Sequence, residues 1–117
     1  MWRVAIVLLL CTACKKQEAA APPVDEDTAP PLPPVELKRG VDACSAYVTK
    51  VCACTAPAAK DLCGLARALP DALEVARQVS VSPDSKRRDV LQANDSQRKT
   101  IKECIEQTAK LPALGCE

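Results

Sequence analysis

Residues 41–54, VDACSAYVTKVCAC, combine a helical pattern of apolar side chains with three of the chain's eight cysteines. Apolar or small residues recur at helical intervals, at Val41, Cys44, Val48, Val51, Cys52 and Thr55. This spacing is typical of one face of an α-helix. Because Pro57 disfavours helical geometry in the residue before it, we predict a first helix that begins near Val41 and ends before Pro57.

The following segment, residues 62–79, carries the longest apolar stripe of the chain. Its members keep one helical phase over about five turns, at Leu62, Leu65, Ala66, Leu69, Ala72, Leu73, Ala76 and Val79. Pro70 lies within the stripe, where a proline typically costs about 3 kcal/mol and kinks a helix. We therefore expect either one kinked helix or two nearly collinear helices.

A third helix is predicted to start at Ser82-Pro83-Asp84, which has serine at the cap and proline at the first helical position. Its apolar positions are Val90, Leu91, Ile101, Cys104, Ile105, Thr108 and Leu111. The stretch Asn94-Asp95-Ser96-Gln97 looks like a second capping sequence. The helix therefore either continues to Lys110 or is broken near Asn94, and Leu111-Pro112 ends it.

None of these segments alternates like a half-buried strand, so residues 41–117 predict an all-α fold. We expect a small disulfide-stapled bundle of three to four helices, a size that suits a chain of 117 residues. Residues 15–40 contain six prolines and few bulky apolar side chains, the prolines being Pro22, Pro23, Pro30, Pro31, Pro33 and Pro34. This composition predicts a disordered proline-rich tether over residues 14–40.

The first 13 residues have the order of a secretory signal. Arg3 supplies a positive charge, Val4–Leu10 is unbroken apolar sequence, and small residues follow. A membrane-spanning helix needs about 20 apolar residues, so this run is too short to span a bilayer. We predict that residues 1–13 are removed during export.

The sequence Cys11-Thr12-Ala13-Cys14 resembles the lipobox of bacterial lipoprotein precursors, with Cys11 where that motif has a branched aliphatic residue. The resemblance implies cleavage before Cys14, diacylglycerol on its sulfur and acylation of the new amino group. Lys15 stands where an aspartate retains such proteins at the inner membrane of many bacteria, which favours the outer membrane. The resemblance covers about the first 15 residues. The alternative is an ordinary cleaved signal with a soluble product.

Removal of Cys11 and acylation of Cys14 leave an even set of cysteines, namely Cys44, Cys52, Cys54, Cys63, Cys104 and Cys116. Such a set in a short exported domain predicts three disulfides. Each bridge typically contributes about 2–4 kcal/mol, a large share of the stability of a domain with a small alanine- and valine-rich core.

Helical geometry constrains the pairing of these cysteines without fixing it. Cys52 and Cys54 point about 200° apart on a helix, so they should have different partners. A short loop between the first two helices would suit Cys54 and Cys63. In an up-down-up bundle the third helix would end beside the end of the first. The pairing that these arguments favour is Cys54–Cys63, Cys52–Cys104 and Cys44–Cys116.

Two chemical alternatives exist for Cys52-Ala53-Cys54. The pair could act as a redox dithiol, although the nearby helix C-terminus disfavours a thiolate. It could also belong to a metal carrier's site, although paired CxxC spacing and histidine are both missing. We expect neither a resident metal nor a cofactor.

Charge and composition exclude several functions. Lysine plus arginine number 16 against 15 acidic residues, so no overall field favours nucleic acid. There is no histidine, which excludes histidine-based triads, and two aromatic residues, Trp2 and Tyr47, are too few for base stacking. Arg87, Arg98 and Lys102 would share one face of a continuous third helix, either as a solvated face or as a contact for an anionic surface.

These features together predict a small cell-envelope lipoprotein with a non-catalytic binding or structural role. Its expected partners are the membrane, through the lipid anchor, and an envelope protein or anionic surface, but no nucleic acid. The alternative is an envelope thiol-redox or metal-carrier protein that uses Cys52 and Cys54.

Overall fold

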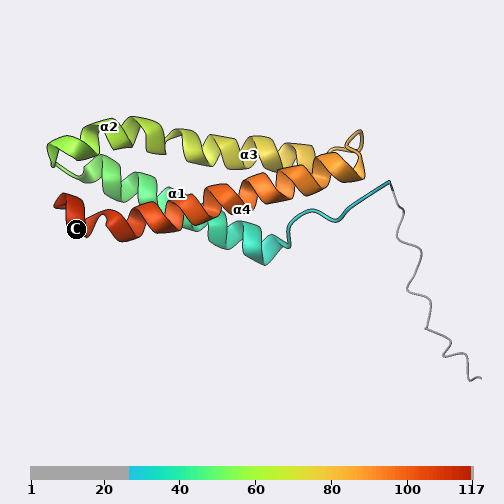
Figure 1. Ribbon diagram of the computed structural model, residues 1–117, viewed down its shortest axis with the longest axis horizontal. Helices are drawn as coiled ribbons and strands as arrows, with labels where there is room; N and C mark the ends of the chain where they lie inside the picture. The colour runs from blue at the N-terminus through green and yellow to red at the C-terminus, as the bar shows by residue number, and fades with distance from the viewer. Residues whose placement is uncertain (1–26, 117) are drawn as a thin grey trace, which may run out of the picture.

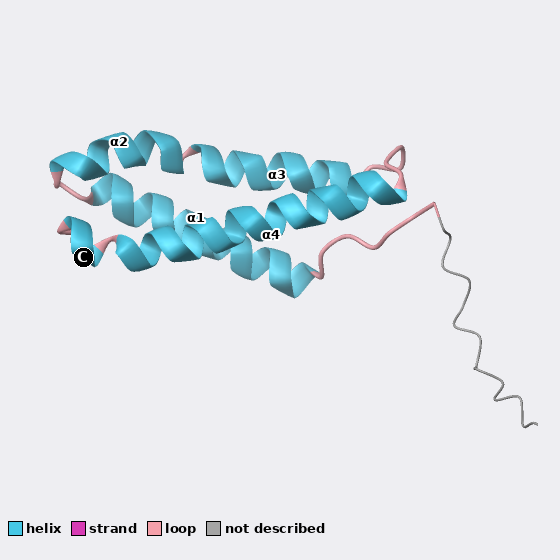
Figure 2. Ribbon diagram, viewed as in Figure 1, coloured by secondary structure: helices cyan, strands magenta, loops and turns pink. Residues whose placement is uncertain are grey.

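Four α-helices and a short 3-10 helix form the described part of the chain, residues 27–116, in a computed structural model (Figures 1 and 2). They are α1 (Pro34–Ala53), α2 (Pro57–Ala66), α3 (Ala68–Val81), α4 (Arg87–Lys110) and η1 (Pro112–Leu114). No strand occurs between residues 27 and 116. The all-α prediction and the expected number of helices are confirmed.

The helices form three rods that lie side by side in an up-down-up arrangement, one made by α1, one by α2 and α3 together, and one by α4. Figure 1 shows α2 and α3 end to end as a single arm that lies antiparallel to both α1 and α4. α4 packs against α1 and α3, and α1 also packs against α2. α1 and α4 therefore run in the same direction, and their relative register decides which cysteines meet.

The α2–α3 arm contains the break that proline predicts. α2 ends at Ala66 and α3 begins at Ala68, so Pro70 lies in the first turn of α3, where a helix needs no proline N–H. The intervening Arg67 keeps right-handed helical angles, and its N–H donates to the Cys63 carbonyl at 3.2 Å. The arm therefore stays nearly straight, as two collinear helices.

The predicted start of the folded domain near Val41 is wrong. α1 begins at Pro34, because proline at the first helical position has a suitable fixed φ and no N–H to satisfy. Glu36 lies in this first turn, where a carboxylate is favoured by the helix dipole. Leu32, just before the helix, is 4% exposed. The tether prediction therefore fails for residues 27–40, and its remainder lies outside the described residues.

Residues 27–33, which we call the strap, lie along α4. The Arg87 N–H donates to the Asp27 carbonyl at 2.7 Å, and its guanidinium Nη1 donates to the Thr28 carbonyl at 3.0 Å. The Asn94 amide donates to the Pro30 carbonyl at 2.9 Å. Because an extended proline-rich backbone makes no hydrogen bonds of its own, its carbonyls are available to these donors.

The start of α4 also differs from the prediction. Ser82-Pro83-Asp84 forms a turn, in which the Asp84 N–H donates to the Ser82 hydroxyl at 3.3 Å. α4 begins at Arg87, and the Asp89 carboxylate accepts the Lys86 N–H at 3.0 Å. The helix then continues through Asn94, whose side chain binds the strap instead of capping a new helix. The helix therefore starts five residues later than the expected position at Ser82, and it is not broken near Asn94.

The core is small and built largely from short side chains. One cluster lies where α1, α2 and the C-terminal residues meet, and its buried members are Tyr47, Val51, Ala59, Ala66, Leu111 and Cys116. A second cluster contains Cys44, Leu73 and Cys104. Cysteine sulfurs thus occupy core positions in both clusters, so the bridges serve as packing groups as well as cross-links.

Candidate functional site

The six predicted cysteines form three disulfides within the described chain. Each bridge uses one cysteine from α1 or from the residue that follows it, Cys54, and the partner cysteines lie on α4, on α2 and after η1. The bridges are Cys44–Cys104, Cys52–Cys63 and Cys54–Cys116, with Cα–Cα distances of 4.9, 4.7 and 5.4 Å. The set of residues and the separate partners of Cys52 and Cys54 are confirmed.

All three expected pairs, Cys54–Cys63, Cys52–Cys104 and Cys44–Cys116, are wrong. They placed Cys104 beside the end of α1, but Cys104 lies six residues before α4 ends at Lys110 and pairs with Cys44, nine residues before α1 ends at Ala53. Cys104 consequently lies beside Cys44, about 12 Å along α1 from Cys52 at 1.5 Å per residue. The same register brings Cys116 to Cys54 and leaves Cys63 for Cys52.

This pairing bears on the two chemical alternatives for Cys52 and Cys54. Both sulfurs are already bonded, to different partners on different elements. Among residues 27–116 no group of three or more histidine, cysteine, aspartate or glutamate side chains is placed to hold a metal ion. A dithiol or thiolate site at these positions would first require reduction of structural bridges.

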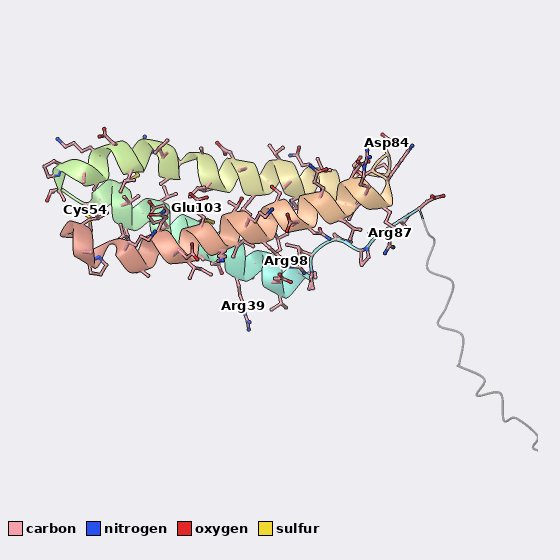
Figure 3. The ribbon with its side chains drawn as sticks, viewed as in Figure 1. Arg39, Cys54, Asp84, Arg87, Arg98 and Glu103 are labelled. Atoms are coloured by element: carbon pink, nitrogen blue, oxygen red, sulfur yellow. A yellow bond between two sulfur atoms is a disulfide. The ribbon has the colours of Figure 1, made fainter. Side chains whose placement is uncertain are left out.

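Three basic residues of α4, Arg87, Arg98 and Lys102, were expected to share one face, and each contacts another group of the chain. Arg98 donates from Nε and Nη2 to the two carboxylate oxygens of Glu36, at 2.8 and 3.3 Å. Arg87 holds the strap, and Lys102 lies 3.7 Å from Glu106. Figure 3 shows Arg87 and Arg98 along the side of α4 that faces the strap and α1. The Arg98 and Lys102 side chains nevertheless remain 56% and 75% exposed, so the solvated face and the contact for an anionic surface both stay predictions.

The Glu36–Arg98 pair gives an expected pH response. Hydrogen bonds from Arg98 lower the pKa of Glu36 below its ordinary value of 4.5. The stabilisation from this pair is therefore fully present above pH 4.5 and is lost as the pH falls through the lowered pKa. We expect a side-chain carboxyl NMR titration to show a Glu36 midpoint below 4.5, and Arg98→Gln to raise it.

The separate pair of Glu74 and Arg77 provides the control for this titration. Hydrogen bonds from Arg77 and Gln78 lower the pKa of Glu74 to about 2. Arg77→Gln should raise the Glu74 midpoint and leave that of Glu36 unchanged. A Glu36 midpoint that is insensitive to Arg98→Gln would contradict the contact between α1 and α4.

A groove of about 710 Å³ lies between α3 and α4, and we call it the α3/α4 groove. Its wall on α3 consists of Ala72, Val75, Ala76 and Val79. Asp84, from the loop between α3 and α4, and Asp89, from the first turn of α4, also line it. Figure 3 shows Asp84 on the loop that joins the two helices. The groove thus has an apolar wall and a carboxylate-bearing end.

The apolar stripe predicted for residues 62–79 is wider than the surface that the bundle buries. Leu73 is 2% exposed, whereas Leu65 is 71%, Val75 62% and Val79 39% exposed. The sequence analysis placed Leu65, Ala72 and Val79 on one apolar stripe, did not include Val75 in it, and predicted no groove. The excess width of the stripe was the available signal, because one helix–helix interface covers only part of such a face.

Two buried amides on α4 were also missed. Gln97 is fully buried and Asn94 is 7% exposed. Their nitrogens donate to the Ala93 and Pro30 carbonyls, but Gln97 Oε1 and Asn94 Oδ1 have no hydrogen-bond partner within the described residues. Buried acceptors of this kind cost about 1–3 kcal/mol when unpaired, so these two oxygens lower the stability of the bundle.

The lipobox-like sequence and Cys14 lie outside the described residues. Within residues 27–116 no helix has the length and apolar character needed to cross a membrane. Comparison with protein-family models, with curated protein sequences and with solved structures finds no match for this chain.

Proposed function

We propose that the chain is a small cell-envelope lipoprotein whose helical domain has a non-catalytic binding or structural role. The observation that carries this proposal is that the described chain's six cysteines are all paired. Such disulfides persist in oxidising compartments and are rare in the cytosol. The signal-like residues 1–13 and the lipobox-like sequence before Cys14 support export and lipid attachment.

The anchor would hold the domain close to the membrane. Each buried CH₂ of an acyl chain contributes about 0.8 kcal/mol, so two or more chains anchor a protein stably. Because the strap fixes residue 27 to α4, only residues 15–26 separate Cys14 from the folded part. A segment of that length spans at most about 40 Å. Lys15 after the acylated cysteine favours the outer membrane.

Metabolic labelling with a palmitate analogue tests the anchor. We expect the wild-type chain to incorporate label and to fractionate with membranes, and Cys14→Ser to do neither. Cys11→Val is the matched control and should retain both properties, because that residue lies on the removed side of the cleavage site and valine is a branched aliphatic residue of the kind the motif has there. A Cys14→Ser protein that still carries label would contradict the proposal.

The alternative is a thiol-redox or metal-carrier role for Cys52 and Cys54. The disulfides of these residues argue against it, because the alternative needs their thiols free. Thiol titration of the native protein separates the two. Unreactive sulfurs at Cys52 and Cys54 support the binding or structural role, whereas two rapidly titrating thiols, or one bound zinc or copper ion per chain, would support the alternative.

A further inference from the structure

We propose that the α3/α4 groove binds an amphipathic helix of a partner protein that presents lysine or arginine beside its apolar face. This inference deepens the proposed binding role, and it rests on that role for the compartment in which the partner would be found. The groove itself can be tested on purified protein, independently of the lipid anchor.

The apolar wall gives the groove its capacity to bind. Val75 and Val79 are 62% and 39% exposed, although both belong to a helix that buries its other side. Covering such side chains stabilises a complex by about 25 cal/mol per Å² of apolar surface removed from water. The wall is therefore an exposed apolar surface that a partner could cover with a gain in binding free energy.

The shape of the groove suits a helix. Short side chains from both rods line it, including Ala72 and Ala76 of α3 and Ala93 and Ser96 of α4. Such residues let a third backbone approach at the distance at which helices pack, about 8–10 Å. An added helix would then complete a four-rod bundle, which is the helix-in-groove mode of recognition.

The charges of the groove select the partner. Asp84 and Asp89 line it, and no lysine or arginine is among its described lining residues. The five ion pairs of the described chain use the carboxylates of other residues, namely Glu36, Asp42, Glu74, Asp95 and Glu106. Asp84 takes part in none of these ion pairs, and the Asp89 carboxylate accepts a backbone N–H, that of Lys86, at 3.0 Å. Both carboxylates keep their negative charge at the groove, and this charge favours a basic partner.

The same charges disfavour the chain's own N-terminal segment as the occupant. That segment enters the described structure at Asp27, which is held by Arg87 at the start of α4. The residues immediately before it are Asp25 and Glu26. Turning them toward Asp84 and Asp89 would bring like charges together, which is unfavourable.

Fluorescence anisotropy with two model peptides tests the proposal. The protein is the full chain with Cys11→Ser and Cys14→Ser and its three disulfides formed. One peptide is a labelled helix of about 18 residues, or five turns, with leucine and alanine on one face and lysine on the other. The second peptide carries glutamate at each lysine position. We expect the lysine peptide to bind at least about tenfold more tightly than the glutamate peptide.

Matched variants locate the site. Asp84→Lys and Val75→Asp should each weaken binding of the lysine peptide about tenfold or more. Asp61→Lys makes the same charge change on α2, and Leu65→Asp places the same carboxylate on another exposed apolar side chain; both should bind like the parent. Circular dichroism should show unchanged helix content in all four.

Several outcomes would overturn the inference. Equal binding of both peptides, or equal loss with Asp84→Lys and Asp61→Lys, would indicate non-specific attraction. A protein that dimerises alone in sedimentation, and becomes monomeric with Val75→Asp, would make a second copy the occupant. Peptide binding by a protein that takes up no palmitate label in cells would refute the anchor alone. A labelled protein without peptide binding would refute the groove alone.

Discussion

Replacing Cys44 and Cys104 together by alanine is expected to lower the free energy of unfolding by about 4–5 kcal/mol. The bridge spans 60 residues. With Cys54–Cys116 intact, however, the loop that it closes is effectively about 22 residues, for which chain entropy contributes about 3–4 kcal/mol. Both side chains are fully buried beside Leu73, so their removal adds a packing loss of about 1 kcal/mol.

Urea unfolding of the oxidised Cys11→Ser, Cys14→Ser chain measures this effect, and the Cys52–Cys63 bridge supplies the comparison. That bridge spans 11 residues, and both of its cysteines are only partly buried. Cys52→Ala with Cys63→Ala should therefore cost about 3 kcal/mol, nearly all of it entropic. A larger loss for this pair than for Cys44 and Cys104 would contradict the assignment of the buried bridge to α1 and α4.

The disulfides illustrate which features the sequence can predict. Periodicity within a helix places Cys52 and Cys54 on different faces, because that geometry depends only on residues close in the chain. The partner of Cys44 depends on the register of α4 relative to α1, and no local sequence pattern specifies that register. The alignment of Cys44 with Cys104 follows from contacts between residues about 60 positions apart, so the pairing could not be predicted from spacing.

The strap shows a second limit of sequence reasoning. Composition predicts disorder for proline-rich residues because they bury little and form no internal hydrogen bonds. It does not reveal that Arg87 and Asn94 supply donors to the carbonyls of Asp27, Thr28 and Pro30. Leu32 adds a buried apolar contact. A segment with no structure of its own is therefore ordered by a neighbouring helix.

The α3/α4 groove was predictable from the sequence only in part. Ala72, Ala76 and Val79 of its wall belong to the apolar stripe predicted for residues 62–79, whereas Val75 lies outside that stripe. The position of Asp84 beside that stripe depends on the turn between α3 and α4, which the predicted helix start at Ser82 misplaced. Most of the apolar wall was thus predictable in principle, and its charged end was not.

Gly40 controls how closely α1 and α4 approach, and Gly40→Leu is expected to lower the free energy of unfolding by about 3 kcal/mol. A Cβ at this position would overlap Cδ1 and Cγ1 of Ile101 and lie 3.3 Å from its Cγ2. Because Cγ1 overlaps as well as Cδ1, rotation about χ2 alone does not relieve the contact. Ile101 must leave its preferred helical rotamer or the two helices must separate. Urea unfolding measures the loss.

Gly64 provides the matched control, because a Cβ there would have no neighbour within 4 Å. Gly64→Leu should leave stability unchanged or raise it by up to about 1 kcal/mol, since leucine favours a helix interior more than glycine does. Ile101→Ala should relieve part of the Gly40→Leu defect, giving a double variant at least about 1 kcal/mol more stable than additivity predicts. If Gly40→Leu were tolerated as well as Gly64→Leu, α1 and α4 would not pack through Gly40.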